Sequence, residues 1–205
     1  MCRGVLLRAS VIEAENARIA YCIGTGKYKY FHAKDPYLHS LANLLVDNKE
    51  SAGTIEITSG RVKLLFHDDA VIAVTGDCKI KVGDTEASPW QALPVAKGSY
   101  VEVSSDSIAY IAVVGGFETP YLILSLAKNR VLGFFSNGRL SQLIDELPAR
   151  RIPQTFRRKS GELKDGIYRA ARSLKAALEA YKRGAKLVRV KVNGRVYEAW
   201  VEEIA

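Results

Sequence analysis

The sequence predicts a closed, mainly β unit over residues 1–148, followed over residues 149–205 by an appendage of one helix and one β-hairpin. Short apolar runs recur between residues 54 and 114, some alternating with polar residues and some continuous, as strands do. Turn residues separate these runs, and we expect glycine to end each of them. The glycines are Gly60, Gly76, Gly98, Gly115 and Gly116. Many short strands with regular turn signals are typical of a barrel.

The first 34 residues predict two strands and a loop. Residues 4–14 and 17–23 are rich in apolar and β-branched side chains, and the polar pair Glu15-Asn16 between them predicts a turn. Residues 24–34 contain two glycines, three aromatic residues and three lysines without apolar periodicity. We therefore expect a surface loop there.

One amphipathic helix is predicted between Asp35 and Asn48. Asp35 has the side chain of an N-cap, and Pro36 occupies the first helical position, where a missing N–H costs nothing. The apolar residues recur at spacings of three and four, so they share one helix face. They are Leu38, Leu41, Ala42 and Leu45.

The central strands differ in how deeply they should be buried. Residues 70–74 and 108–114 are continuous apolar runs, which predicts strands covered on both faces. Around Glu56 the pattern alternates, since Ile55 and Ile57 flank it. Strict alternation favours an outward-facing Glu56 over an inward-facing carboxylate.

The basic charge is confined to the last quarter of the chain. Residues 1–149 contain 15 Lys and Arg against 16 Asp and Glu, whereas residues 150–205 contain 15 against 6. Residues 150–159 predict a basic linker, residues 162–183 an amphipathic helix that Gly184 ends, and Asn193-Gly194 the turn of a hairpin. A solvated helix face is favoured over a nucleic-acid footprint, because no aromatic platform or nucleic-acid motif accompanies the charge.

Composition and spacing exclude several classes of protein. No apolar run reaches the about 20 residues of a membrane span, and the charged N-terminus lacks the apolar core of a signal peptide, so we expect a cytoplasmic protein. The cysteines are scattered, which favours buried thiols over metal or catalytic use. His67 with Asp68 and Asp69 favours a polar turn over a metal site, and we expect no metal. The cysteines are Cys2, Cys22 and Cys78, and the other histidines His32 and His39.

A series of residues in fixed order runs from the predicted helix to residue 147. Its members are Asp35-Pro36, Ala42-Asn43, Leu45-Val46, Asn48, Glu56, Gly60, Asp69-Ala70, Ala73-Val74-Thr75-Gly76, Trp90, Gly98, Tyr110, Ala112-Val113, Gly115-Gly116, Pro120, Gly138-Arg139-Leu140, Asp145 and Leu147. No single member is specific, but the ordered series resembles the carboxyltransferase subunit family that includes allophanate hydrolase subunit 2, KipA and the C-type subunit of 5-oxoprolinase. The resemblance implies a cyclophilin-like barrel.

The resemblance also implies an activity and its partners. Members act on amides, by ATP-dependent hydrolysis of 5-oxoproline or by carboxyl transfer to urea-like amides, together with a KipI-like partner or one like the B-type subunit of 5-oxoprolinase. A partner would use the ATP, and this chain would bind no cofactor. The implied substrate-binding residues are Asn43, Thr75, Gly76, Gly115 and Gly116, with Gly138 and Arg139 as an anion-binding pair. No residue is assigned as the catalytic base.

Three departures from the family pattern leave alternatives open. Of the polar motif that precedes the helix in the family, only Asp35 is present, and a GSRST-like segment is replaced by residues 124–128. Motifs of a second lobe are not found after Leu147. The chain could therefore be a reduced C-type subunit active only with partners, or a non-catalytic binding or regulatory module. A weaker alternative is nucleic-acid association through residues 150–205, and homo-oligomers are left open.

Overall fold

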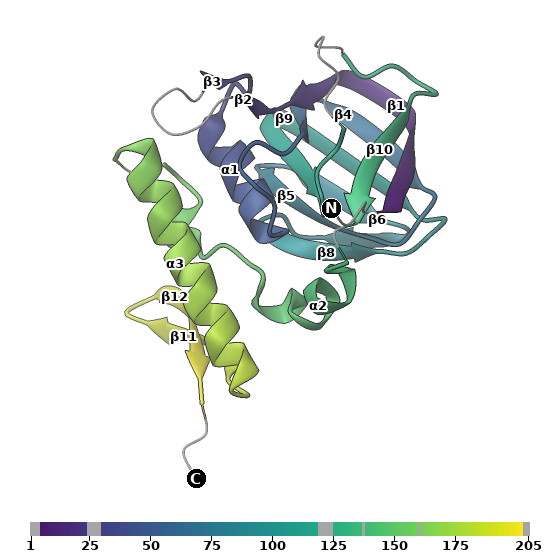
Figure 1. Cartoon of the computed structure of the whole chain (residues 1–205). Coiled ribbons are helices and arrows are strands. Elements are labelled where there is room, and N and C mark those ends of the chain that lie inside the picture. Colours follow the sequence, from purple (N-terminus) through teal and green to yellow (C-terminus); the bar gives the residue numbers. More distant parts are fainter. Residues whose placement is uncertain (1–4, 24–29, 119–124, 137, 160, 203–205) are drawn as a thin grey trace.

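The computed structural model describes residues 5–23, 30–118, 125–136, 138–159 and 161–202. It consists of a curved antiparallel sheet that holds helix α1 (Pro36–Leu45), with helix α3 (Leu163–Lys182) and a hairpin on the far side of α1 (Figure 1). Cys2, Pro120, residues 24–29 of the predicted loop and residue 124 lie outside the described residues. Among the described residues, no helix is both long and apolar enough to span a membrane.

The main sheet has eight strands with the order β10-β1-β4-β9-β5-β8, and β6 joins it through β9 and carries β7. Its strands are β1 (Val5–Ala20), β4 (Thr54–Phe66), β5 (Ala70–Gly76), β6 (Lys79–Val82), β7 (Thr85–Ala87), β8 (Gln91–Val95), β9 (Tyr100–Val113) and β10 (Val131–Ser136). Short β2 (Cys22–Ile23) and β3 (Tyr30–Phe31) pair separately. The mainly β prediction is confirmed, but closure into a barrel was wrong. In the described part of the chain no ladder joins the edge strands β10 and β8, so the sheet is curved and open.

Two β-bulges replace breaks that the sequence predicted. β1 is one strand, not two joined by a turn, and its register against β4 shifts between Glu15 and Ala17. Gly60 likewise lies inside β4, beside a register shift against β9. A Cβ at Gly60 would lie 2.1 Å from the backbone oxygen of Glu15, so glycine here permits close approach of two strands and ends neither.

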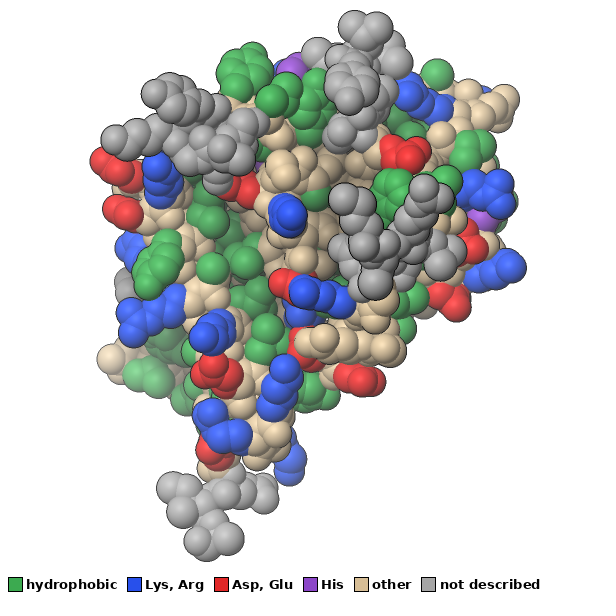
Figure 2. Space-filling model, viewed as in Figure 1, with side chains coloured by type: hydrophobic (Ala, Val, Ile, Leu, Met, Phe, Trp, Pro, Cys, Tyr) green, Lys and Arg blue, Asp and Glu red, His purple; other side chains and the backbone are tan. Residues whose placement is uncertain are grey.

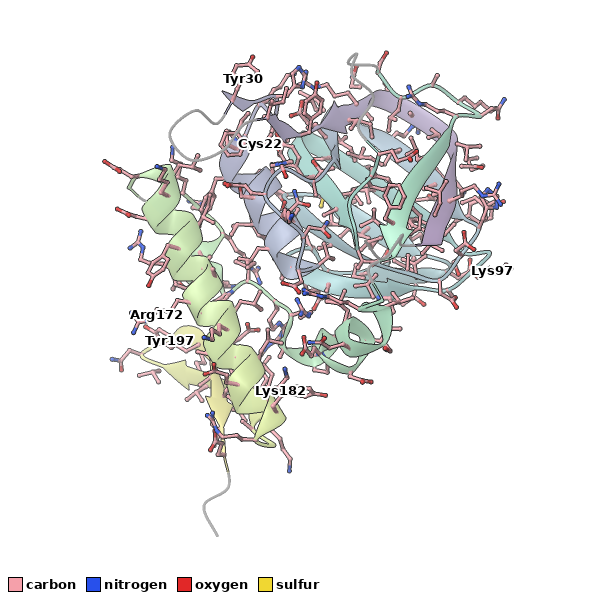
Figure 3. All side chains as sticks on the ribbon, in the orientation of Figure 1. Cys22, Tyr30, Lys97, Arg172, Lys182 and Tyr197 are labelled. Carbon is pink, nitrogen blue, oxygen red and sulfur yellow. The ribbon has the colours of Figure 1, made fainter. Side chains whose placement is uncertain are left out.

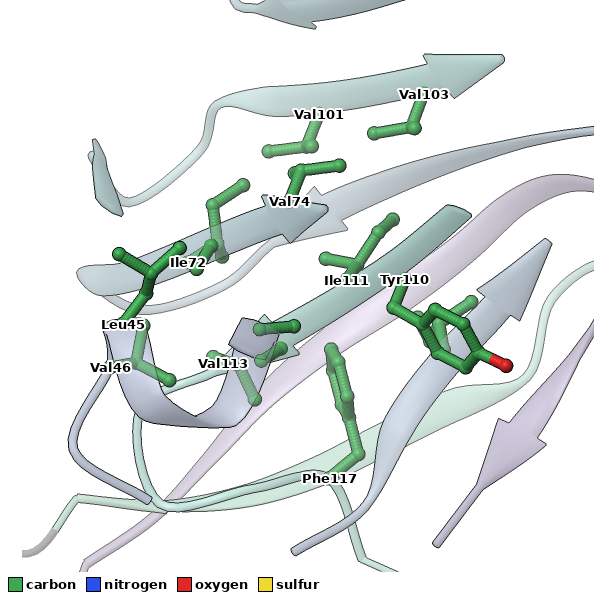
Figure 4. Close-up of a cluster of buried hydrophobic side chains, with 14 of the residues drawn as sticks. Leu45, Val46, Ile72, Val74, Val101, Val103, Tyr110, Ile111, Val113 and Phe117 are labelled. Atoms are coloured by element: carbon green, nitrogen blue, oxygen red, sulfur yellow. The ribbon is translucent and has the colours of Figure 1, made fainter. Parts of the chain in front are cut away.

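The core consists of buried apolar side chains from α1 and from both faces of the central strands (Figure 4). Leu41 and Leu45 of α1 are fully buried, and every residue of β5 is buried, as its continuous apolar run predicts. The cap prediction is also confirmed, because the Asp35 carboxylate accepts hydrogen bonds from the N–H groups of Tyr37 and Leu38 at 2.9 and 3.1 Å. The two interactions fix the position at which α1 starts.

The segment after residue 148 packs on the lobe. Part of the predicted linker is buried: Ile152 is 0% exposed and donates its N–H to the Trp90 oxygen at 2.8 Å, and Arg150 is 4% exposed. The predicted amphipathic helix is α3, whose Ala170 and Leu174 are buried. The short helix α2 (Leu140–Asp145) precedes the linker. The division of the chain into domains at residues 148 and 149 stays a prediction.

The C-terminal hairpin forms as Asn193-Gly194 predicts. Both residues have positive φ angles, 49° and 79°, in the turn between β11 (Lys186–Val192) and β12 (Arg195–Val201). Gly184 has a φ of 92° and follows the end of α3. Basic side chains are frequent over α3 and the hairpin (Figure 2).

Candidate functional site

A cleft with a volume of about 640 Å³ lies at the N-terminal end of α1. Its walls are the start of α1 at Asp35, the end of β5 at Gly76, the Trp90 side chain and residues 157–159. The volume is in the range typical of small-molecule sites. Segments far apart in the sequence meet here, which makes this cleft the best candidate for a functional site.

Trp90 is held in the wall of the cleft by a strained backbone. Its φ of 68° is in the left-handed region, which costs a non-glycine residue roughly 1–2 kcal/mol. Two backbone hydrogen bonds hold it there, one from the Trp90 N–H to the Val74 oxygen at 2.7 Å and one from the Ile152 N–H to the Trp90 oxygen at 2.8 Å. The Trp90 indole is 8% exposed and lies 6.0 Å from the Arg157 guanidinium, within reach of a cation–π contact.

Residues 156–159, at the end of the predicted linker, are attached to α1 and to Ile152 at the start of that linker. The Tyr37 hydroxyl donates to the Phe156 oxygen at 2.8 Å, and Arg157 Nε donates to the Ile152 oxygen at 3.3 Å. Burial lowers the pKa of Arg157 from its ordinary value, yet an arginine remains protonated in proteins. A permanent positive charge is therefore placed beside the Trp90 ring.

The cleft carries an excess of positive charge. Arg157, Arg158 and Lys159 line it, and none of the three forms an ion pair with a described residue. Of the two acidic residues in the walls, Asp35 is engaged in capping α1, and Asp77 is the other. The charge and the indole favour a small anionic ligand with a flat surface.

The floor beneath the start of α1 is a buried carboxylate, Glu56, which is 1% exposed. It accepts hydrogen bonds from Arg18 Nε at 2.7 Å, from the Tyr110 hydroxyl at 2.6 Å and from the Lys34 N–H at 2.8 Å. Burial acts to raise the pKa of Glu56, but these hydrogen bonds outweigh it and hold the pKa below its ordinary value. Glu56 is therefore ionised and fixed.

Glu56 lies on the face of β4 opposite Ile55 and Ile57, as alternation predicts, but the expectation that this outward face is exposed was wrong. Residues 54–57 are all buried, because the loop before α1 covers the second face of β4 at this end. The Tyr110 hydroxyl also accepts the Asp35 N–H at 2.8 Å, so the cluster links the loop to the sheet. Glu56 thus positions the wall of the cleft rather than facing solvent.

Two of the predicted substrate-binding residues lie at this end of α1. Gly76 lines the cleft, and a Cβ there would lie 2.5 Å from the Ile108 oxygen. Thr75 is buried and its hydroxyl donates to the Leu38 oxygen at 2.8 Å, which attaches β5 to α1. Gly76 is therefore part of the cleft surface, and Thr75 supports it.

The other predicted residues lie at the opposite end of α1, a helix of ten residues and so about 15 Å long. Buried Asn43 donates to the Ala52 oxygen at 3.1 Å, and exposed Arg139, next to Gly138, pairs with Asp47. Gly115 and Gly116 line a separate groove of about 480 Å³ beside β10. The structure thus divides the seven residues into two groups, and their roles in substrate binding stay predictions.

His67 and its two acidic neighbours form hydrogen bonds within the sheet lobe. His67 Nε2 lies 2.7 Å from Ser10 Oγ, while Asp68 and Asp69 accept backbone N–H groups. Burial raises the pKa of the Cys78 thiol to about 12, which makes it unreactive. No group of three or more possible metal ligands occurs within the described ranges.

Sequence reasoning missed the main cleft residues. Trp90 and Tyr110 belong to the ordered series, which could have marked them, but Arg157 stood in a segment interpreted as a linker. Nothing in the spacing indicates that Arg18, Glu56 and Tyr110 meet. Long-range contacts of this kind leave no periodic signal.

Comparisons with known proteins agree with this architecture. The carboxyltransferase domain family, subdomain A and B, matches residues 33–199, which extends beyond residue 147 where the ordered series ends. Urea amidolyase of Lachancea kluyveri is 31% identical over 120 residues, which are 55% of this chain and 6% of that protein. The C-type subunit of 5-oxoprolinase from Escherichia coli strain K12 is 31% identical over 113 residues, 53% of this chain and 36% of that protein.

A solved structure shows the same fold. The crystal structure of Kluyveromyces lactis urea carboxylase superimposes with a TM-score of 0.55 at 23% identity, over 67% of this chain and 14% of that one. The matches thus cover a minor part of the length of these relatives. Because the family match extends over most of the chain, the protein belongs to the carboxyltransferase domain family, subdomain A and B.

Proposed function

We propose that this chain is a C-type subunit of a multi-subunit enzyme that acts on amides, and that its substrate is 5-oxoproline. Family membership and the 31% identity to the C-type subunit of a 5-oxoprolinase support the reaction class. The hydrolysis opens the lactam at its C–N bond and adds water to give glutamate, and ATP drives it. A KipI-like partner, or one like the B-type subunit of 5-oxoprolinase, would bind the ATP, and the chain alone would be inactive.

The excess positive charge of the cleft is the observation that carries this choice. Arg157, Arg158 and Lys159 line the cleft without a described ion-pair partner. 5-Oxoproline has a carboxylate that a guanidinium can bind with two parallel hydrogen bonds, and a flat lactam that can lie against Trp90. Urea has no charge to match these cations. The cleft therefore favours 5-oxoproline over urea.

The residues of this chain would bind and orient the substrate. Arg157 and Arg158 would hold the carboxylate, and the Trp90 ring would limit the tilt of the lactam. Glu56 keeps the start of α1 in place and has all its hydrogen bonds within the chain, so it has no free role as a base. The groups that move protons and phosphate would come from the partner subunits.

The test is an assay of the chain co-expressed with the candidate partner subunits encoded beside it. We expect ATP-dependent release of glutamate from 5-oxoproline by the complex and none by the chain alone. Arg158→Gln should raise KM for 5-oxoproline about tenfold, because it removes one charged hydrogen bond. The control is Lys97→Gln, an exposed cation on the far side of the lobe from α3 (Figure 3).

Absence of turnover with every candidate partner would reject the enzymatic proposal. Binding of 5-oxoproline by the complete complex without turnover would instead identify a non-catalytic binding module. An unchanged KM in Arg158→Gln would reject the cleft as the substrate site while leaving the reaction class in place.

A further inference from the structure

The C-terminal hairpin has two chemically different faces. Leu187 and Trp200 face α3, where the Trp200 ring lies 6.0 Å from that of Tyr181. Because side chains alternate along a strand, the cross-strand pairs Val188–Ala199 and Val190–Tyr197 lie on the opposite face. We call this opposite face the outer hairpin face; its apolar residues are Val188, Val190, Val192, Tyr197, Ala199 and Val201, and the exposed Lys186 lies beside Val201 at its edge.

The outer hairpin face is apolar and exposed to solvent. Val190 is 44% exposed, Val192 49%, Tyr197 50% and Val201 47%. Of the 13 exposed large hydrophobic side chains among the described residues, these four lie on the outer hairpin face. Tyr197 projects away from the sheet lobe (Figure 3). A two-stranded hairpin is marginally stable alone, and a contiguous apolar surface on a folded protein marks a contact with another molecule.

The surroundings of this face are basic. Residues 163–202 contain ten Lys and Arg against four Asp and Glu. Some of these cations are neutralised locally, as in the pairs Arg183–Glu202 and Arg189–Glu198. Exposed Arg172 and Lys191 form no ion pair with a residue that the structure describes. Two copies of such a surface would repel each other, whereas an acidic surface would be attracted.

We propose that the outer hairpin face is the docking surface for a partner subunit that presents an apolar centre surrounded by acidic side chains. The inference rests on the proposed function, because the partner is a subunit of the proposed enzyme. A protein fits better than a nucleic acid, since four valines, an alanine and a tyrosine make up most of the face and Lys186 lies only at its edge. Burial of the valines would supply affinity, and the basic surroundings would supply specificity and salt dependence.

The experiment compares two tyrosines that are similarly exposed on strands. Tyr197→Ser removes the largest side chain of the outer hairpin face, and Tyr100→Ser removes a 41% exposed tyrosine of β9. Affinity for the purified B-type partner of the proposed 5-oxoprolinase is measured by isothermal titration calorimetry. We expect Kd to rise at least tenfold for Tyr197→Ser and less than twofold for Tyr100→Ser. Wild-type Kd should also rise when NaCl increases from about 0.05 to about 0.5 M.

A second variant and a thermal unfolding measurement distinguish loss of binding from loss of folding. Val190→Lys places a charge in the centre of the face without changing the side that packs on α3, so it should unfold at the wild-type temperature and bind at least tenfold more weakly. Equal binding by wild type, Tyr197→Ser and Val190→Lys would overturn the docking surface and leave the proposed function standing. Failure of the wild type to bind the partner would overturn both.

Two further measurements detect other molecules that could bind the outer hairpin face. Sedimentation of the chain alone, with and without Val190→Lys, would detect a dimer that uses this face, and such a dimer would overturn the inference. Titration with a single-stranded oligonucleotide would detect nucleic-acid binding, and its loss in Tyr197→Ser would overturn the inference in the same way.

Discussion

A buried carboxylate holds each end of α1, but the surroundings of the two carboxylates differ. Glu56 lies beneath the start of the helix and binds Arg18, Tyr110 and the Lys34 N–H. Near the other end, Glu146 accepts hydrogen bonds from Arg150 at 2.6 Å, Gln142 and Lys182, and Arg150 donates to the Leu45 oxygen at 3.1 Å. The Glu56 cluster attaches the start of α1 to the sheet, and the Glu146 cluster attaches its end to the segment that follows α2.

The difference lies in the polar groups around each cluster. At the end of α1, Asn48 donates to Asn43 at 3.0 Å and accepts the Gly115 N–H at 2.7 Å, and Arg139 pairs with Asp47. At the start, Arg157, Arg158 and Lys159 have no ion-pair partner among the described residues. The comparison shows that the polar groups at the end of α1 bind one another and stabilise the fold. The cations at the start of α1 remain available to bind a ligand.

Gly115→Ala should cause the largest loss of stability, and it tests whether the residues at the end of α1 have a structural role. Gly115 has a φ of 83°, and a Cβ would lie 1.5 Å from the Phe135 oxygen, so strain and overlap should lower the free energy of unfolding by roughly 3 kcal/mol or more. Gly138→Ala is the matched control, with a φ of 68° and open space, and should cost about 1 kcal/mol. Urea unfolding measures both. Equal losses would contradict the assignment.

Glu56→Ala should have the next largest effect. It leaves the Arg18 guanidinium, the Tyr110 hydroxyl and the Lys34 N–H without their acceptor, and should lower the free energy of unfolding by about 2–3 kcal/mol. Glu13→Ala, at an exposed carboxylate that pairs with Arg61, should cost about 0.5 kcal/mol. If both variants unfold at the same urea concentration, Glu56 does not anchor the start of α1.

Acid should weaken the Glu146 cluster. Burial acts to raise the pKa of Glu146, but Gln142, Lys182 and Arg150 outweigh it and lower the pKa from 4.5 to about 2. Because the folded pKa is depressed, the stabilisation is complete above pH 4.5 and is lost as the pH falls toward 2. The free energy of unfolding should fall more steeply with acid in the wild type than in Glu146→Gln. Parallel curves would contradict the role of Glu146.

The smallest effect on stability is expected at the open end of α1. Arg158 is exposed and forms no ion pair with a described residue, so Arg158→Gln should change the free energy of unfolding by less than about 0.5 kcal/mol. Thermal unfolding checks this. A loss comparable to that of Glu56→Ala would show that the cation has a structural role and is not free for a ligand.

Local signals in the sequence predicted the elements whose causes are local. The Asp35 cap, the apolar run of β5 and the turn at Asn193-Gly194 each depend on a few adjacent residues, and the structure confirms all three. Closure of the sheet could not be predicted, because it depends on whether edge strands β10 and β8 meet. The exposure of Glu56 could not be predicted from alternation, since a distant loop covers that face.

The candidate site was predictable only in part. The family resemblance named Thr75 and Gly76, which lie at or beneath the cleft, but it also named Asn43 and Gly115 at the other end of α1. Arg157 reaches the cleft because Tyr37 and Ile152 hold its segment there. Such placement arises from tertiary contacts and has no counterpart in residue spacing.

The most direct measurement of the central claim is titration of the assembled complex with 5-oxoproline and with urea, using wild type and Arg158→Gln. Unpartnered cations at the start of α1 predict that 5-oxoproline binds and urea does not, and that Arg158→Gln weakens 5-oxoproline binding about tenfold. Binding of urea in preference to 5-oxoproline, or equal binding of 5-oxoproline by both proteins, would contradict the claim.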